Sequence, residues 1–150
     1  MKFSDGERIQ WVGGHIIDFD PNEPNLREGV DRWWLKPIKF NQGGYDSILV
    51  DKGEGVIKFI QLTIQTTHTF KFEYYNQAIR SICGRLRESG LMVEVYFIVP
   101  RTLMRGFKIP AGGHLEGCKG GADKATRSNE GCEECVCWKW RHVAGIEWGN

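Results

Sequence analysis

The spacing of hydrophobic positions changes from that of strands to that of a helix, and back again, along this chain of 150 residues. Up to residue 65, short runs rich in β-branched and aromatic residues alternate with glycine-containing turns, which is typical of strands. We expect two short strands within 3–20, broken at Gly13 and Gly14, and further strands at 33–40, 46–50 and 56–65. Pro37 lacks a backbone N–H, which predicts an edge position or a bulge for its strand. The glycines of 51–55 predict a hairpin.

From about residue 69 the hydrophobic positions follow helical spacing and predict one amphipathic helix that ends at Gly90. Its apolar stripe is expected to lie in the core and consists of Tyr75, Ala78, Ile79, Ile82, Cys83 and Leu86. A buried-type strand follows at 93–99 and is stopped by Pro100. The succession of strand, helix and strand predicts a right-handed crossover, and hence an α/β fold with a mixed sheet.

The last third of the chain has a different composition, because Gly, Lys and Cys become frequent and no long periodic run remains. We expect loop or disorder at 112–134 and a short strand or helix at 138–148. The predicted organisation is therefore an α/β domain over 1–105, followed by a poorly structured Gly/Cys-rich tail over 106–150.

Composition places the chain among globular proteins, with 41% hydrophobic and 26% charged residues. The formal net charge of +1 argues against a general polyanion binder, which is normally clearly basic. No segment approaches the roughly 18 apolar residues that a membrane helix needs, and the first residues lack the apolar run of a secretory signal. The odd number of five cysteines does not resemble a secreted disulfide framework. We therefore expect no membrane association and a reducing, intracellular compartment.

Alternation along the strand 56–65 places three polar residues, Gln61, Thr63 and Gln65, on the face that begins with Ile57 and Phe59. Such a strand would be buried at one end and polar at the other, as the floor of a cleft is. A strand face turned to solvent explains the same pattern without any site, and the residues alone favour this simpler explanation.

A hairpin through 51–55 would bring Asp46 close to Gln61 and Thr63. Mg²⁺ prefers a few hard oxygen ligands, with waters completing an octahedron. The Asp46 carboxylate, the Gln61 amide oxygen and a backbone carbonyl form such a set. A cation held there would support hydrolysis of a phosphodiester.

An ordered set of short motifs over 33–100 resembles the C-terminal region of the retrotransposon hot spot proteins of trypanosomatids and of the related Crinkler-type effectors. The set comprises an aromatic–x–Pro strand, an Asp opening the next strand, a Gln-x-Thr strand, a His before a helix, and a last strand ending in Val-Pro. The matching residues are Trp34 or Leu35 with Pro37, Asp46, Gln61 with Thr63, His68 with Thr69, and Val99 with Pro100.

The resemblance implies a fold of the PD-(D/E)XK restriction-endonuclease type and a nuclease-related function on DNA or RNA. It implies that Asp46 is the metal ligand and that Gln61 replaces the second acidic residue. Thr63 stands at the position of the superfamily's lysine, and Thr63, His68 or Lys71 would position water or phosphate. Mg²⁺ is the implied cofactor, and the nucleus or the cytoplasm is the implied location.

Two features depart from the superfamily pattern. No helix carrying an acidic residue is evident before the strand 33–40, where Glu28 is the only stand-in, and no phosphate-binding loop of an ATPase is present. We therefore expect a fragment or a short paralogue. One alternative is a catalytically inactive nucleic-acid-binding or chromatin-associated module of the same family.

Another alternative is a protein-interaction module with a zinc-stabilised tail. Zinc takes four nitrogen or sulfur ligands, and the candidate set is His114, Cys118, Cys132 and Cys135, with Cys137 and His142 nearby. A single C-x2-C pair with a loose His-x3-Cys partner is weak support, so we favour incidental cysteines over a zinc site.

Overall fold

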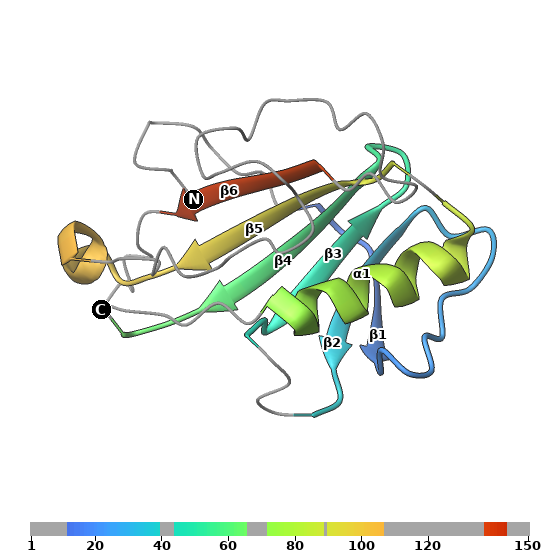
Figure 1. The fold of residues 1–150 in the computed structure, drawn as a ribbon, viewed down its shortest axis with the longest axis horizontal. Helices are drawn as coiled ribbons and strands as arrows, with labels where there is room; N and C mark the ends of the chain where they lie inside the picture. Colours follow the sequence, from blue (N-terminus) through green and yellow to red (C-terminus); the bar gives the residue numbers. More distant parts are fainter. Residues whose placement is uncertain (1–11, 40–43, 66–71, 89, 107–136, 144–150) are drawn as a thin grey trace.

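The computed structural model describes residues 12–39, 44–65, 72–88, 90–106 and 137–143. Within these residues, strands β1 to β6 form one sheet in their sequence order, and helix α1 lies against one face of it (Figure 1). The elements are β1 His15–Phe19, β2 Arg32–Pro37, β3 Ser47–Asp51, β4 Val56–Leu62, α1 Phe72–Leu86, β5 Met92–Ile98, the 3₁₀ helix Arg101–Gly106 and β6 Cys137–Val143. β2, β3 and β4 are successively antiparallel, whereas β1 is parallel to β2, β5 to β4 and β6 to β5.

The mixed sheet confirms the α/β class, and the parallel pairing of β4 with β5 across α1 confirms the expected strand–helix–strand unit. α1 turns its apolar stripe to the sheet: Tyr75, Ala78, Ile79 and Ile82 are buried in the same core cluster as residues of β1 to β5. Burial of one such side chain contributes about 1.5–3 kcal/mol for the larger members of the stripe. Packing of this face therefore provides most of the stability that the helix needs.

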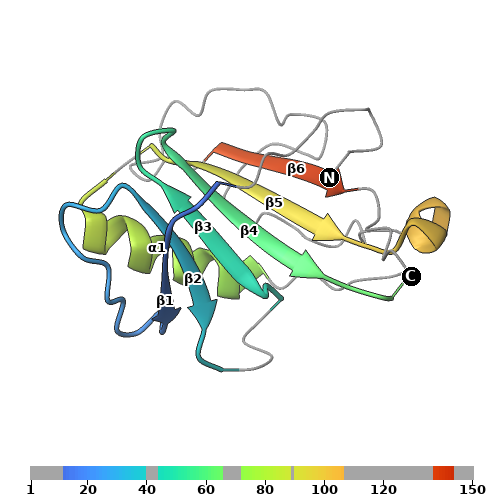
Figure 2. The same ribbon diagram turned by 180° about the vertical axis from the view of Figure 1, so that it is seen from behind.

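The opposite face of the sheet, seen in Figure 2, carries a second and smaller cluster of buried residues. This cluster consists of Leu49, Ile60, Tyr96 and Ile98, with Val12 and Trp34 packed against it. Lys58 alternates with Ile57 and Phe59 and so lies on this second face. It is therefore separated from Gln61 by the sheet.

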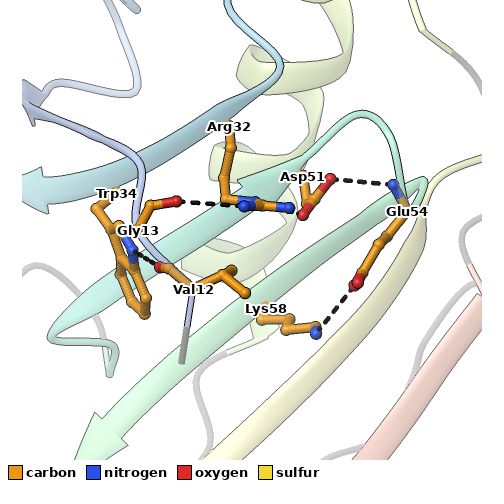
Figure 3. A network of polar contacts seen from close by, with 7 residues as sticks. All are labelled: Val12, Gly13, Arg32, Trp34, Asp51, Glu54 and Lys58. Carbon is orange, nitrogen blue, oxygen red and sulfur yellow. Dashed lines mark hydrogen bonds and ion pairs between the residues drawn. The ribbon is translucent and has the colours of Figure 1, made fainter. Parts of the chain in front are cut away.

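An ion pair between the half-buried Arg32 and the buried Asp51 fixes the hairpin end of the sheet (Figure 3). The Arg32 Nε donates to Asp51 Oδ2 at 2.6 Å, and Arg32 Nη1 donates to the Gly13 carbonyl at 3.3 Å. Burial by itself would raise the pKa of the Asp51 carboxyl. Hydrogen bonds from the Glu54 and Gly53 amides, together with the hydrogen bond and charge of Arg32, hold that pKa below its usual value instead. Asp51 is therefore a structural carboxylate.

Two further contacts in Figure 3 tie the segment before β1 and the hairpin to the sheet. The Trp34 indole N–H donates to the Val12 carbonyl at 3.0 Å, and Lys58 Nζ lies 3.4 Å from Glu54 Oε2. The polar groups of Lys58 and Trp34 therefore have structural partners within this part of the sheet.

The prediction that Pro37 marks an edge strand or a bulge is wrong, because β2 lies between β1 and β3 and keeps a continuous register with β1 up to Pro37. The proline is accommodated because it is the last residue of the strand. The next amide, that of Ile38, donates to the Phe19 carbonyl at 3.2 Å, so the pairing with β1 is completed beyond the proline.

The prediction that Gly90 ends the helix is also wrong. α1 ends at Leu86, and Arg87 follows in the left-handed conformation with φ of 55°. The Glu88 N–H donates to the Cys83 carbonyl at 3.2 Å, which is the six-to-one hydrogen bond of a Schellman motif. The chain thus leaves the helix three residues before Gly90, which has a positive φ of its own, 76°.

The C-terminal region contributes β6, which pairs with β5 in parallel and lies at one edge of the sheet. The remaining parts of this region, 107–136 and 144–150, lie outside the described residues. The proposed zinc ligands His114, Cys118, Cys132 and Cys135 fall in the first of these parts, so the zinc site stays a prediction.

Candidate functional site

Asp46 lies directly before β3 and is bonded to the end of β4. Its backbone N–H donates to the Ile60 carbonyl at 2.8 Å, and its Oδ2 accepts the Leu62 N–H at 2.6 Å. The carboxylate thus takes the role of a backbone carbonyl where β3 begins. The hairpin therefore brings Asp46 next to Leu62, the residue that follows Gln61, as the sequence predicts. Asp46 itself is exposed.

Gln61 continues the helix-facing side of β4 beyond Ile57 and Phe59. Its Nε2 donates to the Leu62 carbonyl at 3.4 Å, whereas its Oε1 is buried without a hydrogen-bond partner among the described residues. A Cβ built on Gly44 would lie 3.8 Å from this oxygen, so the amide faces the turn that leads to Asp46. A buried acceptor without a donor is costly, which makes Gln61 Oε1 suited to a cation or a water.

Tyr75, in the first turns of α1, closes the site from the helix side. Its hydroxyl donates to the Gly44 carbonyl, and its ring lies 5.5 Å from Tyr45 and 4.9 Å from Phe59 between ring centroids. Burial first, and then the negative charge of Asp46 and the neighbouring Tyr45, raise the pKa of the Tyr75 phenol well above its usual value. The phenol therefore stays a hydrogen-bond donor at neutral pH.

Tyr45 is the other phenol at this end of the sheet. Its hydroxyl is buried and has no hydrogen-bond partner in the described part of the chain. Burial, with a smaller contribution from the charge of Asp20, raises the pKa of Tyr45 to about 12. The sequence pattern does not single out Tyr45, and it places Tyr75 only in the helical core.

Thr63 follows the end of β4 and is only half-buried. Its N–H donates to the Ile98 carbonyl at 3.0 Å, and its Oγ1 accepts the Gln65 N–H at 3.1 Å. The hydroxyl therefore shapes the local turn. The strand is shorter than expected, and Thr63 and Gln65 do not extend a flat polar face beside Gln61.

His68 and Lys71 lie outside the described residues, so their proposed roles stay predictions. Across the described ranges, no group of three or more His, Cys, Asp or Glu side chains is placed to hold a metal ion. The arrangement instead combines a single carboxylate, that of Asp46, with the Gln61 amide oxygen. Carboxylate and amide oxygens are ligand types that Mg²⁺ accepts, with waters completing the coordination.

Comparison of the chain with protein-family models, with curated proteins and with solved structures finds no match. The resemblance to the retrotransposon hot spot proteins therefore depends on the ordered motifs in the sequence. Among the described residues, no helix is long and apolar enough to cross a membrane.

Proposed function

We propose that this chain is a nuclease-related domain of the restriction-endonuclease type that binds Mg²⁺ through Asp46 and Gln61 and hydrolyses phosphodiester bonds in DNA or RNA. One observation carries the proposal: the Asp46 carboxylate is held at the end of β4, next to Gln61, whose buried Oε1 has no hydrogen-bond donor among the described residues. A fixed carboxylate beside an unsatisfied amide oxygen is a plausible anchor for a hard cation.

The order of elements supports the proposal. An aromatic strand ending in proline (β2) is followed by a strand that Asp46 opens (β3), a strand that contains Gln61 (β4), a helix and a last buried strand. This is the order of motifs by which the sequence resembles the retrotransposon hot spot proteins. The antiparallel β2, β3 and β4 and the parallel β5 are consistent with the mixed sheet that the resemblance implies.

In the proposed mechanism, Asp46 and Gln61 would hold the cation through one carboxylate oxygen and one amide oxygen at the end of β4. When bound, the cation supplies stabilisation of the negative charge that develops on the phosphate. Thr63 contributes no charge, which leaves the positioning of water or phosphate to His68 or Lys71. A neutral amide in place of a second carboxylate weakens cation binding, so we expect slow hydrolysis.

The test compares wild-type protein with Asp46→Asn on labelled single- and double-stranded DNA and RNA, in Mg²⁺, Mn²⁺ and EDTA. The asparagine keeps an oxygen that can accept the Leu62 N–H but removes the charge, so the fold is expected to persist. We expect metal-dependent cleavage that falls about 100-fold or more in the variant, as for loss of a charged group that stabilises a transition state.

Asp18→Asn is the matched control, because Asp18 is an exposed carboxylate whose only described ion pair, to Lys36, is 3.8 Å long. Equal cleavage by wild-type protein and both variants would exclude Asp46 as the metal ligand. Absence of cleavage by folded wild-type protein in either metal would refute the catalytic function.

A second candidate is a nucleic-acid-binding or chromatin-associated module without catalysis. It is favoured by the single carboxylate of the site and by the engagement of Asp46 Oδ2 with a backbone amide. This function predicts salt-sensitive binding of DNA or RNA that Asp46→Asn does not change. Under either function we propose a nuclear or cytoplasmic location.

The zinc-stabilised interaction module is the third function proposed from the sequence. It predicts stoichiometric zinc in purified protein, and loss of that zinc in Cys132→Ser. Metal analysis of the wild-type protein and this variant decides it independently of any cleavage assay.

A further inference from the structure

The contact between Tyr75 and Gly44 joins helix α1 to the turn before β3, across 31 positions of the sequence. The phenol hydroxyl donates to the Gly44 carbonyl. The Tyr75 ring packs against the rings of Tyr45 and Phe59, which also contact each other, so the three rings form one cluster. The turn is thereby attached to the rigid core of the domain.

Gly44 itself shows how closely the turn approaches the tyrosine. Its φ is +100°, a conformation that residues with a side chain rarely adopt. A Cβ at this position would lie 3.4 Å from the Tyr75 hydroxyl and 3.8 Å from Gln61 Oε1. The backbone of the turn therefore lies directly against both side chains.

Asp46 is attached to the sheet only two residues after Gly44. Its backbone N–H bonds the Ile60 carbonyl, and its carboxylate bonds the Leu62 N–H. Between them, the attachment at Gly44 and the attachment at Asp46 restrain both ends of a three-residue segment. Among the described residues Asp46 has no ion pair, so these two attachments are what holds its carboxylate at the end of β4.

We propose that Tyr75 is a positioning residue, which holds the Gly44 carbonyl so that the Asp46 carboxylate stays bonded to the Leu62 amide beside Gln61. The positioning of Asp46 follows from the contacts alone, and its importance for a divalent cation rests on the proposed function. Removal of a residue that orients a metal ligand without touching the metal typically lowers metal affinity by about 10- to 100-fold.

The test uses the full chain and Tyr75→Phe, which removes one hydroxyl and keeps the ring. Tyr45→Phe is the matched control, because it removes a neighbouring buried hydroxyl that has no hydrogen-bond partner in the described residues. The first readout is amide hydrogen exchange at Leu62 and at Thr63, whose N–H bonds the Ile98 carbonyl on the other side of β4. The second readout is Mn²⁺ affinity by calorimetry.

In Tyr75→Phe we expect the amide exchange rate at Leu62 to rise about tenfold relative to the rate at Thr63. A change of this size is expected when roughly one hydrogen bond no longer protects the amide. We expect Mn²⁺ affinity to fall by about tenfold or more. Tyr45→Phe should leave both quantities as in the wild type.

The proposal is overturned if exchange at Leu62 and at Thr63 rises by the same factor in Tyr75→Phe, because the hydroxyl then stabilises the fold as a whole and has no specific effect on the bond between Asp46 and Leu62. It is also overturned if Tyr75→Phe behaves like Tyr45→Phe. If wild-type protein binds no Mn²⁺, the proposed function fails separately, and the ratio of exchange rates at Leu62 and Thr63 still decides whether Tyr75 positions Asp46.

Discussion

At the scale of single residues, two phenols of one aromatic cluster have different hydrogen bonding. Tyr45 and Tyr75 lie 5.5 Å apart between ring centroids, and both pack near Phe59. The Tyr75 hydroxyl has an acceptor in the Gly44 carbonyl, whereas the Tyr45 hydroxyl is buried without one among the described residues. Because a buried polar group is costly when it has no partner, the same substitution is expected to have different effects at the two positions.

Tyr75→Phe is expected to lower the free energy of unfolding by about 1–2 kcal/mol, since it leaves the Gly44 carbonyl without its donor. Tyr45→Phe is expected to leave that free energy unchanged or to raise it by up to about 1 kcal/mol, since it removes an unsatisfied hydroxyl. Urea unfolding followed by circular dichroism measures both. Equal losses in the two variants would contradict the assignment of hydrogen bonds at this cluster.

At the scale of elements, helix α1 shows where local sequence and tertiary structure disagree. The helix ends at Leu86 in a Schellman motif that requires a left-handed residue, and the chain places Arg87 there. A non-glycine residue in this conformation costs about 1 kcal/mol relative to glycine. Leu91 is buried in the core and Leu86 packs against it, which explains why the chain turns at this point in spite of that cost.

Arg87→Gly is therefore expected to raise the free energy of unfolding by about 0.5–1 kcal/mol. Arg85→Gly is the matched control, because Arg85 lies within the helix, where glycine costs about 1 kcal/mol. Chemical denaturation should therefore give opposite signs for the same substitution at positions two residues apart. A loss of stability in both variants would exclude the observed end of α1.

At the scale of the whole molecule, the described titratable groups with shifted pKa values predict a stability maximum between two limits. The pKa of the Asp51 carboxyl is below its usual value of 3.8, and those of the Tyr45 and Tyr75 phenols are above their usual value of 10.0. Stability depends on pH wherever folded and unfolded protein bind different numbers of protons. These groups therefore predict a loss of stability at acid pH and another at alkaline pH.

The acid limit follows from Asp51. Because its pKa is lower in the folded protein, its contribution is fully present above the unfolded value of 3.8 and is lost as the pH falls through the folded value. Asp51→Asn should lower the free energy of unfolding at neutral pH by about 2–3 kcal/mol, since it leaves Arg32 without a charged partner. Below about pH 4, the urea concentration at the unfolding midpoint should then fall less steeply with pH for Asp51→Asn than for the wild type. Parallel acid profiles for the two proteins would contradict this.

The alkaline limit follows from the tyrosines. The pKa of Tyr45 is raised to about 12 in the folded protein, so stability is unaffected below pH 10.0, the unfolded value, and falls as the pH rises from there towards 12. The Tyr75 phenol acts in the same direction. Tyr45→Phe should flatten this part of the profile, as measured by urea midpoints from about pH 9 to pH 11.5. An unchanged slope would indicate that Tyr45 ionises as readily in the folded protein.

The site was predicted less completely than the fold. The hairpin and strand alternation were sufficient to place Asp46 near Gln61, because both depend on local spacing. Tyr75 and Gly44 were not recognised as site residues. Their contact spans 31 positions and forms only when α1 packs on the sheet, so no local pattern could indicate it.

Local periodicity determined by itself that this protein has strands before and after one amphipathic helix, with the apolar stripe of that helix in the core. It did so because side chains repeat every two residues on a strand and about every 3.6 on a helix. Only the tertiary structure decided that β2 is an interior strand, that α1 ends at Leu86 and that β6 joins the sheet. The places of β2 and β6 depend on which distant strand satisfies their backbone groups, and the end of α1 depends on how the following segment packs on the core.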